Sequence, residues 1–396
     1  MKFTGVVLVG GRGARLKELT EKVPKPMIKI GHISFLNHLL NYVCKFNFKT
    51  IYLLCSYKST FIFKEFHNKY IFNVKIVCIK EKKPQGTAGA LYNLKKYIKD
   101  DFILLNGDSI IKHDLNKFFK KSLQNKTIAN ILLVKNKNYK SNKKLSNLNF
   151  SKSKFVTFTK DEKNNYMNAG VYFFKSRFLN LITKKKISLE EEILPKLINK
   201  KKLSSVLSKG VFLDIGTKKN LKKANEFLKK NFKNKAILLD RDGVIIEDKG
   251  YVGSLKDTKF LKGVIKGIQF IAKKKFLIFV ITNQSGIGRG FYKIKDMKNI
   301  HNYLNLNFKK NHSEIKKFYY CPHHPKYGKG IFKIKCFCRK PQPGMILKCI
   351  REFNLDINSS IMIGDKLIDR LASQKAGLKF FYKKKISFLN QLKKIL

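Results

Sequence analysis

The alternation of strand-like and helix-like segments constrains the fold of this 396-residue chain more than any other feature. Short apolar runs such as residues 4–9 and 51–55 precede stretches with helical periodicity, a pattern typical of α/β proteins. The alternation begins again at residue 236, after a lysine-rich amphipathic segment at 221–235. The length allows two separate hydrophobic cores. We therefore predict an α/β protein with two doubly wound, Rossmann-like domains, residues 1–232 and 233–396.

The net charge of +59 first suggests a nucleic-acid partner. However, only eight of the 85 basic residues are arginine, and the lysines are spread from end to end. Together with abundant Asn, Ile and Phe and the absence of Trp, this indicates the codon bias of an AT-rich genome. We therefore expect no specific nucleic-acid partner, although the charge would attract anionic, phosphorylated substrates. An RNA-binding protein is the alternative.

The beginning of the chain and three of its seven cysteines indicate a cytoplasmic protein. Residues 1–11 run from an apolar strand into a glycine loop without the cleavage pattern of a signal peptide. No apolar run approaches the length of a membrane span, so we expect no membrane partner. Cys44, Cys55 and Cys78 stand among apolar neighbours, as reduced core thiols do. The sequence leaves the oligomeric state open.

Two aspartates stand one residue apart at the end of an apolar run, in the stretch ILLDRDGVI. Side chains two apart point to the same face of a strand, so Asp240 and Asp242 converge where the strand leaves the core. Like charges this close repel each other unless a cation or a shared proton lies between them. A polar turn that ends a strand is the alternative interpretation of such a pair.

Three further polar clusters follow apolar runs: VITNQSG, CRKPQPG and IMIGDKLID. Such positions are where α/β sheets build ligand sites. With ILLDRDGVI, these segments resemble the haloacid-dehalogenase phosphatases. The resemblance implies that Asp240 is a nucleophile and that Asp242 is a general acid and then a base. It also implies that Thr282 and Lys340 hold the transferring phosphoryl oxygens, with Mg²⁺ on Asp240, Asp242 and Asp365.

Four soft potential ligands occur as two close pairs: Cys321 with His323, and Cys336 with Cys338. This set suits a closed, tetrahedral, structural Zn²⁺, whereas a disulfide is disfavoured in the cytoplasm. His324 is an alternative to His323, and unliganded loop thiols are the alternative to a metal site. Because Lys340 follows closely along the chain, zinc would also fix the loop that presents this lysine.

Within the phosphatases, these segments look most like the zinc-bearing enzymes that act on D-glycero-D-manno-heptose 1,7-bisphosphate, with histidinol-phosphate phosphatases as the alternative. The resemblance implies five residues that line the substrate pocket: Asn283, Gln284, Ser285, Arg289 and Arg339. The two arginines suit the second phosphate of a bisphosphate. A solvated surface role is the alternative for either of them.

In the N-terminal half, glycines follow directly after the first strand at Gly10, Gly11 and Gly13. Glycines there let backbone N–H groups approach phosphates, and Arg15 and Lys25 supply positive charge. The spacing differs from that of the dinucleotide-binding fingerprint, and the GK[ST] of a Walker loop is absent. The loop therefore predicts a phosphate-binding site of another kind.

Six segments in matching order resemble the sugar-phosphate nucleotidyltransferases: VGGRGARLKELTEKVPKPM, EKKPQGTAGAL, LLNGDS, NAGVYFF, SLEEEILPKL and FLDIGT. The resemblance implies a GT-A-like domain in which Mg²⁺ binds Asp108 and Asp214. Arg15 and Lys25 would stabilise developing charge. Two further sets are implied: Gly10, Gly11, Gly13, Gln85, Gly86 and Thr87 for the nucleotide, and Asn168, Gly170 and Glu190 for the sugar. Ala14 departs from the threonine that is usual in the family.

The two resemblances together predict consecutive reactions in one chain. A phosphatase that removes the 7-phosphate leaves heptose 1-phosphate, which a nucleotidyltransferase then activates. The N-terminal half looks like the heptose 1-phosphate guanylyltransferases, so we expect GTP as the co-substrate. The product would serve a bacterial surface glycan such as lipopolysaccharide. The alternatives are another nucleotide-sugar synthesis joined to a histidinol-phosphate-type phosphatase, or a phosphatase with a non-catalytic transferase-like domain.

Overall fold

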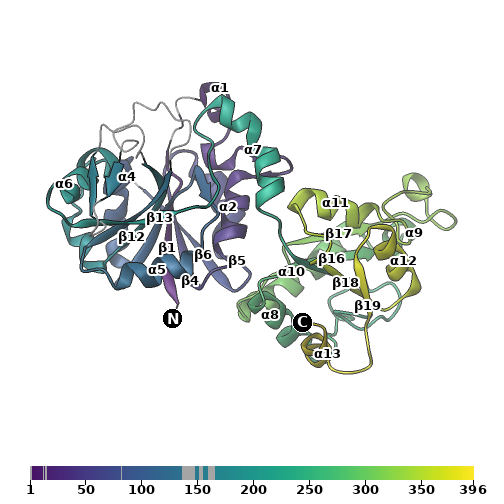
Figure 1. Ribbon diagram of the computed structural model, residues 1–396. Coiled ribbons are helices and arrows are strands. Elements are labelled where there is room, and N and C mark those ends of the chain that lie inside the picture. The colour runs from purple at the N-terminus through teal and green to yellow at the C-terminus, as the bar shows by residue number, and fades with distance from the viewer. Residues whose placement is uncertain are drawn as a thin grey trace. The chain divides into compact units, whose positions relative to one another are not determined.

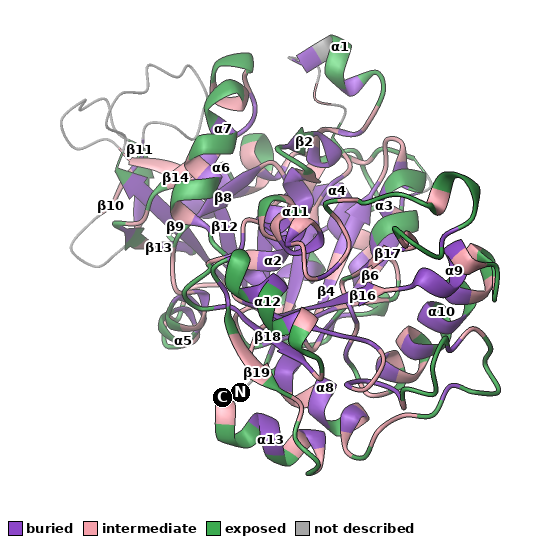
Figure 2. Ribbon diagram, turned by 90° about the vertical axis from the view of Figure 1, so that its right-hand side faces the viewer, coloured by how far each residue is buried: buried purple, intermediate pink, exposed green. Residues whose placement is uncertain are grey.

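A computed structural model describes residues 2–11, 13, 16–81, 83–135, 148–150, 155–158 and 166–396. The chain forms two compact units (Figure 1). Unit 1 comprises Met1–Lys69 and Val74–Phe232, and unit 2 comprises Tyr70–Asn73 and Lys233–Leu396. In both units the strands are largely buried, while the helices expose their outer faces (Figure 2).

A mixed ten-stranded sheet forms the centre of unit 1, with β9 and β13 joined to the strand path β11-β10-β12-β7-β1-β4-β6-β5. Its strands are β1 (Phe3–Leu8), β4 (Phe48–Cys55), β5 (Lys69–Ile71), β6 (Val74–Lys80), β7 (Phe102–Asn106), β9 (Ala129–Lys135), β10 (Leu148–Phe150), β11 (Val156–Phe158), β12 (Tyr166–Phe174) and β13 (Leu203–Ser208). The parallel strands β1, β4, β6 and β7 are rich in apolar residues and mostly buried, as expected for strands covered on both faces. Strand β12 runs antiparallel to β7.

The described part of unit 1 also contains two short strand pairs and seven α-helices. The pairs are β2 (Lys29–Ile30) with β3 (Ile33–Ser34), and β8 (Ser109–Ile111) with β14 (Phe212–Asp214). The helices are α1 (Lys17–Thr20), α2 (Phe35–Val43), α3 (Ser59–Phe66), α4 (Gly86–Gly89), α5 (Leu115–Leu123), α6 (Leu194–Asn199) and α7 (Lys218–Asn231). Helix α7 begins after Thr217, whose side chain accepts a hydrogen bond from the Asn220 N–H, so the cap fixes where this lysine-rich helix starts.

Unit 2 contains a five-stranded sheet with the order β17-β16-β15-β18-β19, in which every neighbouring pair is parallel. The strands are β15 (Ala236–Leu239), β16 (Leu277–Asn283), β17 (Lys317–Cys321), β18 (Ile361–Gly364) and β19 (Lys379–Tyr382). Because the order reverses direction beside the first strand, β15 lies at the switch point where such sheets place their ligands. The predicted α/β, Rossmann-like fold class is confirmed in both units.

Helices cover both faces of the sheet of unit 2 (Figure 1). They are α8 (Val264–Lys273), α9 (Ser285–Arg289), α10 (Ile294–Lys310), α11 (Gly344–Phe353), α12 (Leu367–Lys375) and α13 (Phe388–Ile395). Helices α8, α10 and α13 pack together on one face, and α11 and α12 cover the other. Gly267 lets α8 and α13 approach closely, because a Cβ there would lie 2.6 Å from the Phe388 ring.

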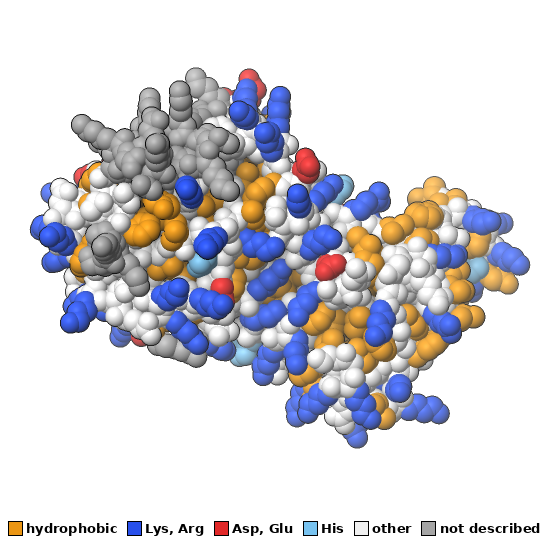
Figure 3. Space-filling model, in the orientation of Figure 1, with side chains coloured by type: hydrophobic (Ala, Val, Ile, Leu, Met, Phe, Trp, Pro, Cys, Tyr) orange, Lys and Arg blue, Asp and Glu red, His pale blue; other side chains and the backbone are white. Residues whose placement is uncertain are grey.

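Lysine and arginine side chains are scattered over the face of the molecule shown in Figure 3 and do not form a single stripe. A nucleic-acid site normally gathers its basic residues on one face or along one helix.

Among the residues that the structure describes, no helix is both long enough and apolar enough to cross a membrane.

Candidate active sites and a candidate metal centre

The predicted phosphatase residues meet at the carboxyl edge of the sheet of unit 2. Asp240 directly follows β15, Asp365 directly follows β18, and Thr282 is near the end of β16. These three strands are adjacent and parallel, so their ends share one edge. Asp240 is 7% exposed and Thr282 is 1% exposed. The edge therefore forms a site in which charge is only weakly screened by water.

Lys340 lies inside this site as a buried cation. Its Nζ is 3.0 Å from Asp240 Oδ1 and 2.6 Å from Asp369 Oδ1, and it donates a hydrogen bond to the Ile281 carbonyl. Burial alone would lower the pKa of Lys340. The two neighbouring carboxylates have the opposite and larger effect, so the pKa lies above its usual value. The ammonium group therefore stays charged and can neutralise anionic oxygens.

Three carboxylates, those of Asp240, Asp365 and Asp369, offer oxygens that all lie within 4.8 Å of one another. Burial and the negative charge of Asp369 together raise the pKa of Asp240 to about 7, against the opposing effect of Lys340. Asp365 Oδ1 is buried and has no hydrogen-bond partner. Crowded carboxylates with an unpartnered oxygen suit a hard divalent cation, so these residues fit Mg²⁺.

Sequence reasoning missed Asp369. This residue is fully buried in the first turn of α12, and its Oδ2 accepts a hydrogen bond from the Lys366 N–H. A signal was available, because Asp369 follows Asp365 by four residues at the start of a helix. Aspartates that cap a helix are common in the first turn, so the sequence pattern alone does not reveal that Asp369 also contacts Lys340.

The Asp242 carboxylate lies outside the group of three and has its own partners. Arg241 Nε and Nη2 donate to its two oxygens at 3.0 and 3.1 Å, and Gln284 Nε2 donates to Oδ2 at 2.9 Å. Arg241 is fully buried. Of the predicted magnesium ligands, the structure thus brings together Asp240 and Asp365, with Asp369 in place of the Asp242 side chain.

Two predicted substrate residues instead hold the chain around Lys340. The Asn283 side chain donates to the Lys340 carbonyl and accepts from the Lys340 N–H, both at 3.0 Å. Arg339 Nη1 donates to the His323 carbonyl at 3.0 Å. These bonds fix the segment that delivers the buried ammonium group.

The other predicted pocket residues lie at the start and end of α9. Ser285 begins this helix and is 7% exposed. The Arg289 guanidinium lies 4.5 Å from the ring centroid of Tyr327 and 5.1 Å from that of Tyr251, and its Nε is buried without a hydrogen-bond partner. Stacking on two rings holds the guanidinium while leaving its N–H groups for an anion.

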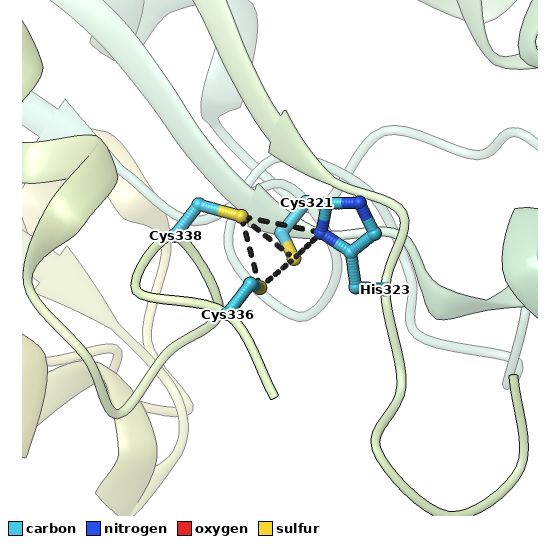
Figure 4. A group of neighbouring side chains, drawn as sticks. All are labelled: Cys321, His323, Cys336 and Cys338. Carbon is cyan, nitrogen blue, oxygen red and sulfur yellow. Dashed lines mark hydrogen bonds between the residues drawn. The ribbon is translucent and has the colours of Figure 1, made fainter. Parts of the chain in front are cut away.

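The four predicted zinc ligands converge into one cluster (Figure 4). Sulfur–sulfur distances are 3.0 Å for Cys336–Cys338, 3.3 Å for Cys338–Cys321 and 3.5 Å for Cys321–Cys336. His323 Nδ1 lies 3.4 Å from Cys338 Sγ and 3.6 Å from Cys321 Sγ. A tetrahedral zinc with Zn–S bonds of about 2.3 Å separates its sulfurs by roughly 3.8 Å, so the cluster is close to that size.

The alternative ligand His324 has a different role. Its Nδ1 accepts hydrogen bonds from the N–H groups of Lys326 and Tyr327 at 3.3 and 3.1 Å, so this nitrogen stabilises the turn that follows. None of the seven cysteines forms a disulfide. The residues of the cluster therefore fit a structural zinc ion.

In unit 1, strand pairing brings the two predicted metal aspartates together from distant parts of the sequence. β14 pairs with β8 so that Asp214 is opposite Ser109, and the Ile215 N–H donates to the Asp108 carbonyl. Lys25 Nζ is 2.6 Å from Asp108 Oδ2. The predicted partner Arg15 lies outside the described residues. Lys25 and the two aspartates thus combine a cation with two carboxylates, as nucleotidyl transfer requires.

A cavity of about 760 Å³ lies beside the glycine loop, a size that suits a nucleotide. Its lining includes Gly10, Gly11, Gly86 and Thr87, but neither Gly13 nor Gln85. Gly86 has φ +74°, and a Cβ there would lie 2.5 Å from the Ile187 carbonyl oxygen, so only glycine fits. Gln85 lies next to the cavity and donates its N–H to the Glu81 carboxylate.

The predicted sugar-binding residues form one hydrogen-bonded group. Thr87 Oγ1 donates to Glu190 Oε2 at 2.7 Å, and the Tyr172 hydroxyl donates to Glu190 Oε1 at 3.4 Å. Asn168 Nδ2 donates to the Tyr172 hydroxyl, while Asn168 Oδ1 accepts from the Gly170 N–H. Sequence reasoning missed the fully buried Tyr172, which joins the segments.

Comparison with known proteins finds a different family in each part of the chain. The family model described as Nucleotidyl transferase matches residues 4–231, and the model of Haloacid dehalogenase-like hydrolase matches residues 331–383. The crystal structure of HddC from Yersinia pseudotuberculosis is 29% identical with a TM-score of 0.50, and the match covers 57% of this chain and 99% of HddC.

Two curated relatives match the C-terminal part. The D-glycero-beta-D-manno-heptose-1,7-bisphosphate 7-phosphatase of Vibrio cholerae is 41% identical over 143 residues, which cover 36% of this chain and 77% of that enzyme. The D-glycero-alpha-D-manno-heptose-1,7-bisphosphate 7-phosphatase of Campylobacter jejuni is 42% identical over 146 residues, which cover 37% of this chain and 80% of that enzyme. The chain therefore belongs to the nucleotidyl transferase family through its N-terminal region and to the heptose-bisphosphate 7-phosphatases, haloacid dehalogenase-like hydrolases, through its C-terminal region.

Proposed function

We propose that this chain is a bifunctional enzyme that makes a nucleotide-activated heptose. Residues 233–396 remove the 7-phosphate of D-glycero-D-manno-heptose 1,7-bisphosphate, and residues 1–232 transfer a nucleotidyl group, GMP from GTP, to the resulting heptose 1-phosphate. The observation that carries the proposal is the presence of two separately built phosphate sites in one chain, one around Asp240 and Lys340 and one around Asp108 and Lys25. Family membership supports the two activities.

In the phosphatase site, Asp240 attacks the phosphorus of the substrate and forms an aspartyl phosphate. Asp242 donates a proton to the departing sugar oxygen and then accepts one from the water that hydrolyses the aspartyl phosphate. Lys340 and Thr282 hold the phosphoryl oxygens. Mg²⁺ held by Asp240 and Asp365, with Asp369 close by, would supply further neutralisation of negative charge.

In the transferase site, an oxygen of the sugar 1-phosphate attacks the α-phosphorus of the nucleotide, and pyrophosphate leaves. The cavity beside Gly10 and Gly86 receives the nucleotide, while the group around Glu190 orients the sugar. Lys25 balances the charge that develops on the phosphates. Asp108 and Asp214 would hold Mg²⁺, which neutralises the triphosphate.

One assay tests both activities. Purified protein with Mg²⁺ and heptose 1,7-bisphosphate is given GTP, CTP or ATP separately, and phosphate and pyrophosphate are measured together. We expect phosphate in every reaction and pyrophosphate with GTP alone. Phosphate without pyrophosphate would contradict the transferase assignment, and pyrophosphate with another nucleotide would correct the donor. If neither product is released, the heptose substrate is wrong.

Gly243, in the turn after Asp242, packs closely against the proposed magnesium ligand Asp365. Gly243 has φ +78°, and a Cβ there would lie 2.3 Å from Asp365 Oδ2. Gly243→Ala should therefore displace the Asp365 carboxylate, raise the Mg²⁺ concentration needed for half-maximal phosphate release, and lower kcat by about 100-fold. Magnesium titrations of phosphate release measure both effects.

Gly250→Ala is the matched control for this substitution. Gly250 has a similar φ of +67° but no atom near its would-be Cβ, so alanine imposes the same backbone strain without displacing a carboxylate. We expect its magnesium dependence to equal that of the unmodified protein. Equal losses in both variants would show that backbone strain, and not Asp365, controls the activity.

A further inference from the structure

The ring of Tyr292 occupies a slot between two glycines of the phosphatase unit. A Cβ on Gly286 would lie 2.3 Å from the Tyr292 ring, and one on Gly253 would lie 2.4 Å from it. Any larger side chain at either position would displace the ring, because a packed interior has no space to absorb such an overlap. The slot therefore fixes where the tyrosine hydroxyl lies.

The hydroxyl begins a chain of hydrogen bonds that ends at two proposed catalytic residues. It lies 2.8 Å from Gln284 Oε1. The Gln284 Nε2 atom in turn lies 2.9 Å from Asp242 Oδ2 and 2.8 Å from Thr282 Oγ1. Gln284 is only 1% exposed, so protein groups rather than bulk water determine the orientation of its amide.

The chemistry of the partners determines the direction of each hydrogen bond. Both oxygens of Asp242 accept hydrogen bonds from the Arg241 guanidinium, and the Gln284 atom that faces Asp242 Oδ2 is the amide nitrogen, so the NH₂ group donates to Asp242. The amide oxygen then faces Tyr292, whose hydroxyl must donate. Burial raises the pKa of Tyr292 to about 12, so the hydroxyl retains this proton throughout the neutral range.

The same constraint reaches Thr282. The second N–H of the Gln284 amide points to Thr282 Oγ1, which accepts it and keeps its own proton for another acceptor. If the amide were reversed, its oxygen would face the Asp242 carboxylate and would take the Thr282 proton. Only one of the two amide orientations therefore leaves the threonine hydroxyl able to donate to a phosphoryl oxygen.

We propose that Tyr292 is a positioning residue that fixes the amide of Gln284, and that this amide orients both the Asp242 carboxylate and the Thr282 hydroxyl proton for phosphoryl transfer. The proposal rests on the phosphatase function proposed above. It replaces the predicted substrate-binding role of Gln284 with a role in orienting catalytic groups.

Tyr292→Phe tests the proposal because it keeps the ring in its slot and removes only the donor. We expect kcat for heptose 1,7-bisphosphate to fall about tenfold, as for the loss of one buried hydrogen bond, with KM within about twofold. The loss of kcat/KM should be smaller for p-nitrophenyl phosphate, whose leaving group needs little protonation from Asp242.

Tyr319→Phe is the matched control. Tyr319 is also buried in unit 2, and its hydroxyl donates to Glu352 at 2.6 Å, away from the proposed catalytic residues. It should lose stability comparably but retain kcat for both substrates. Equal kcat in the two variants, or a loss that does not depend on the leaving group, would overturn the role of Tyr292.

A crystal structure of Tyr292→Phe tests the proposal without relying on activity. We expect the Gln284 amide to be turned or displaced and the Asp242 carboxylate to have moved with it; unchanged positions of both would overturn the proposal. If the unmodified protein released no phosphate from any monoester, the phosphatase function itself would fail, and this structure would still decide the role of Tyr292.

Discussion

Replacing Asp240 by asparagine is expected to abolish phosphate release from heptose 1,7-bisphosphate while leaving pyrophosphate release from heptose 1-phosphate and GTP unchanged. The amide has nearly the same shape as the carboxylate but is neither a nucleophile for phosphorus nor a strong ligand for Mg²⁺. Loss of the nucleophile should lower kcat by about 10⁴-fold or more. Both products are measured on the same preparation, so the unaffected reaction shows that the transferase unit is folded.

Asp108→Asn provides the reciprocal control, because Asp108 belongs to the transferase site beside Lys25. This variant should lose pyrophosphate release and keep phosphate release. Phosphate release that survives in Asp240→Asn would refute the assignment of the nucleophile. A loss of both activities in either variant would instead indicate that the two reactions depend on each other.

Replacement of Cys338 by serine should have the second largest effect, because it removes one of four ligands from the candidate zinc centre. We expect about one zinc per chain in the unmodified protein and a large loss of zinc in the variant. Structural zinc supplies much of the folding free energy of small metal-bearing loops, so the unfolding midpoint of the phosphatase unit should fall by roughly 10 °C. Elemental analysis and calorimetry measure these quantities.

Cys338→Ser should also lose phosphate release, because Cys338 lies two residues before Lys340 and the candidate zinc loop carries the ammonium group that we propose to be catalytic. Cys349→Ser is the control: Cys349 is a buried cysteine of the same unit outside the cluster, and its loss should leave the zinc content unchanged. A metal-free unmodified protein with full stability would contradict a structural zinc ion.

Much of the fold followed from the sequence because the relevant signals are local. Apolar runs at 236–239 and 361–364 both become buried strands, and a polar cluster follows each of them directly. The parallel sheet then gathers these clusters at one edge, so Asp240 and Asp365 lie near each other although they are far apart in the sequence. The short spacings in the cysteine and histidine pairs were similarly informative.

The parts that escaped sequence reasoning depend on tertiary contacts. Asp369 looks like an ordinary helix-capping residue until Lys340 is placed beside it. Tyr292 looks like a surface aromatic residue until two glycines are seen to form its slot. Asp242 was expected to share a cation with Asp240. Its carboxylate instead pairs with the side chain of the preceding residue, Arg241, and the sequence does not reveal that this arginine is buried. The roles of all these residues remain predictions.

The pairing of β8 with β14 has a consequence for synthesis on the ribosome. Asp108 and most of the nucleotide cavity are encoded in the first half of the transferase region, but Asp214 is supplied by a strand close to its end. A nascent chain that stops before Phe212 therefore possesses the glycine loop without the second carboxylate. The proposed nucleotidyl-transfer centre is complete only after translation has passed this strand, whereas Asp240 directly follows the first strand of the region that is translated next.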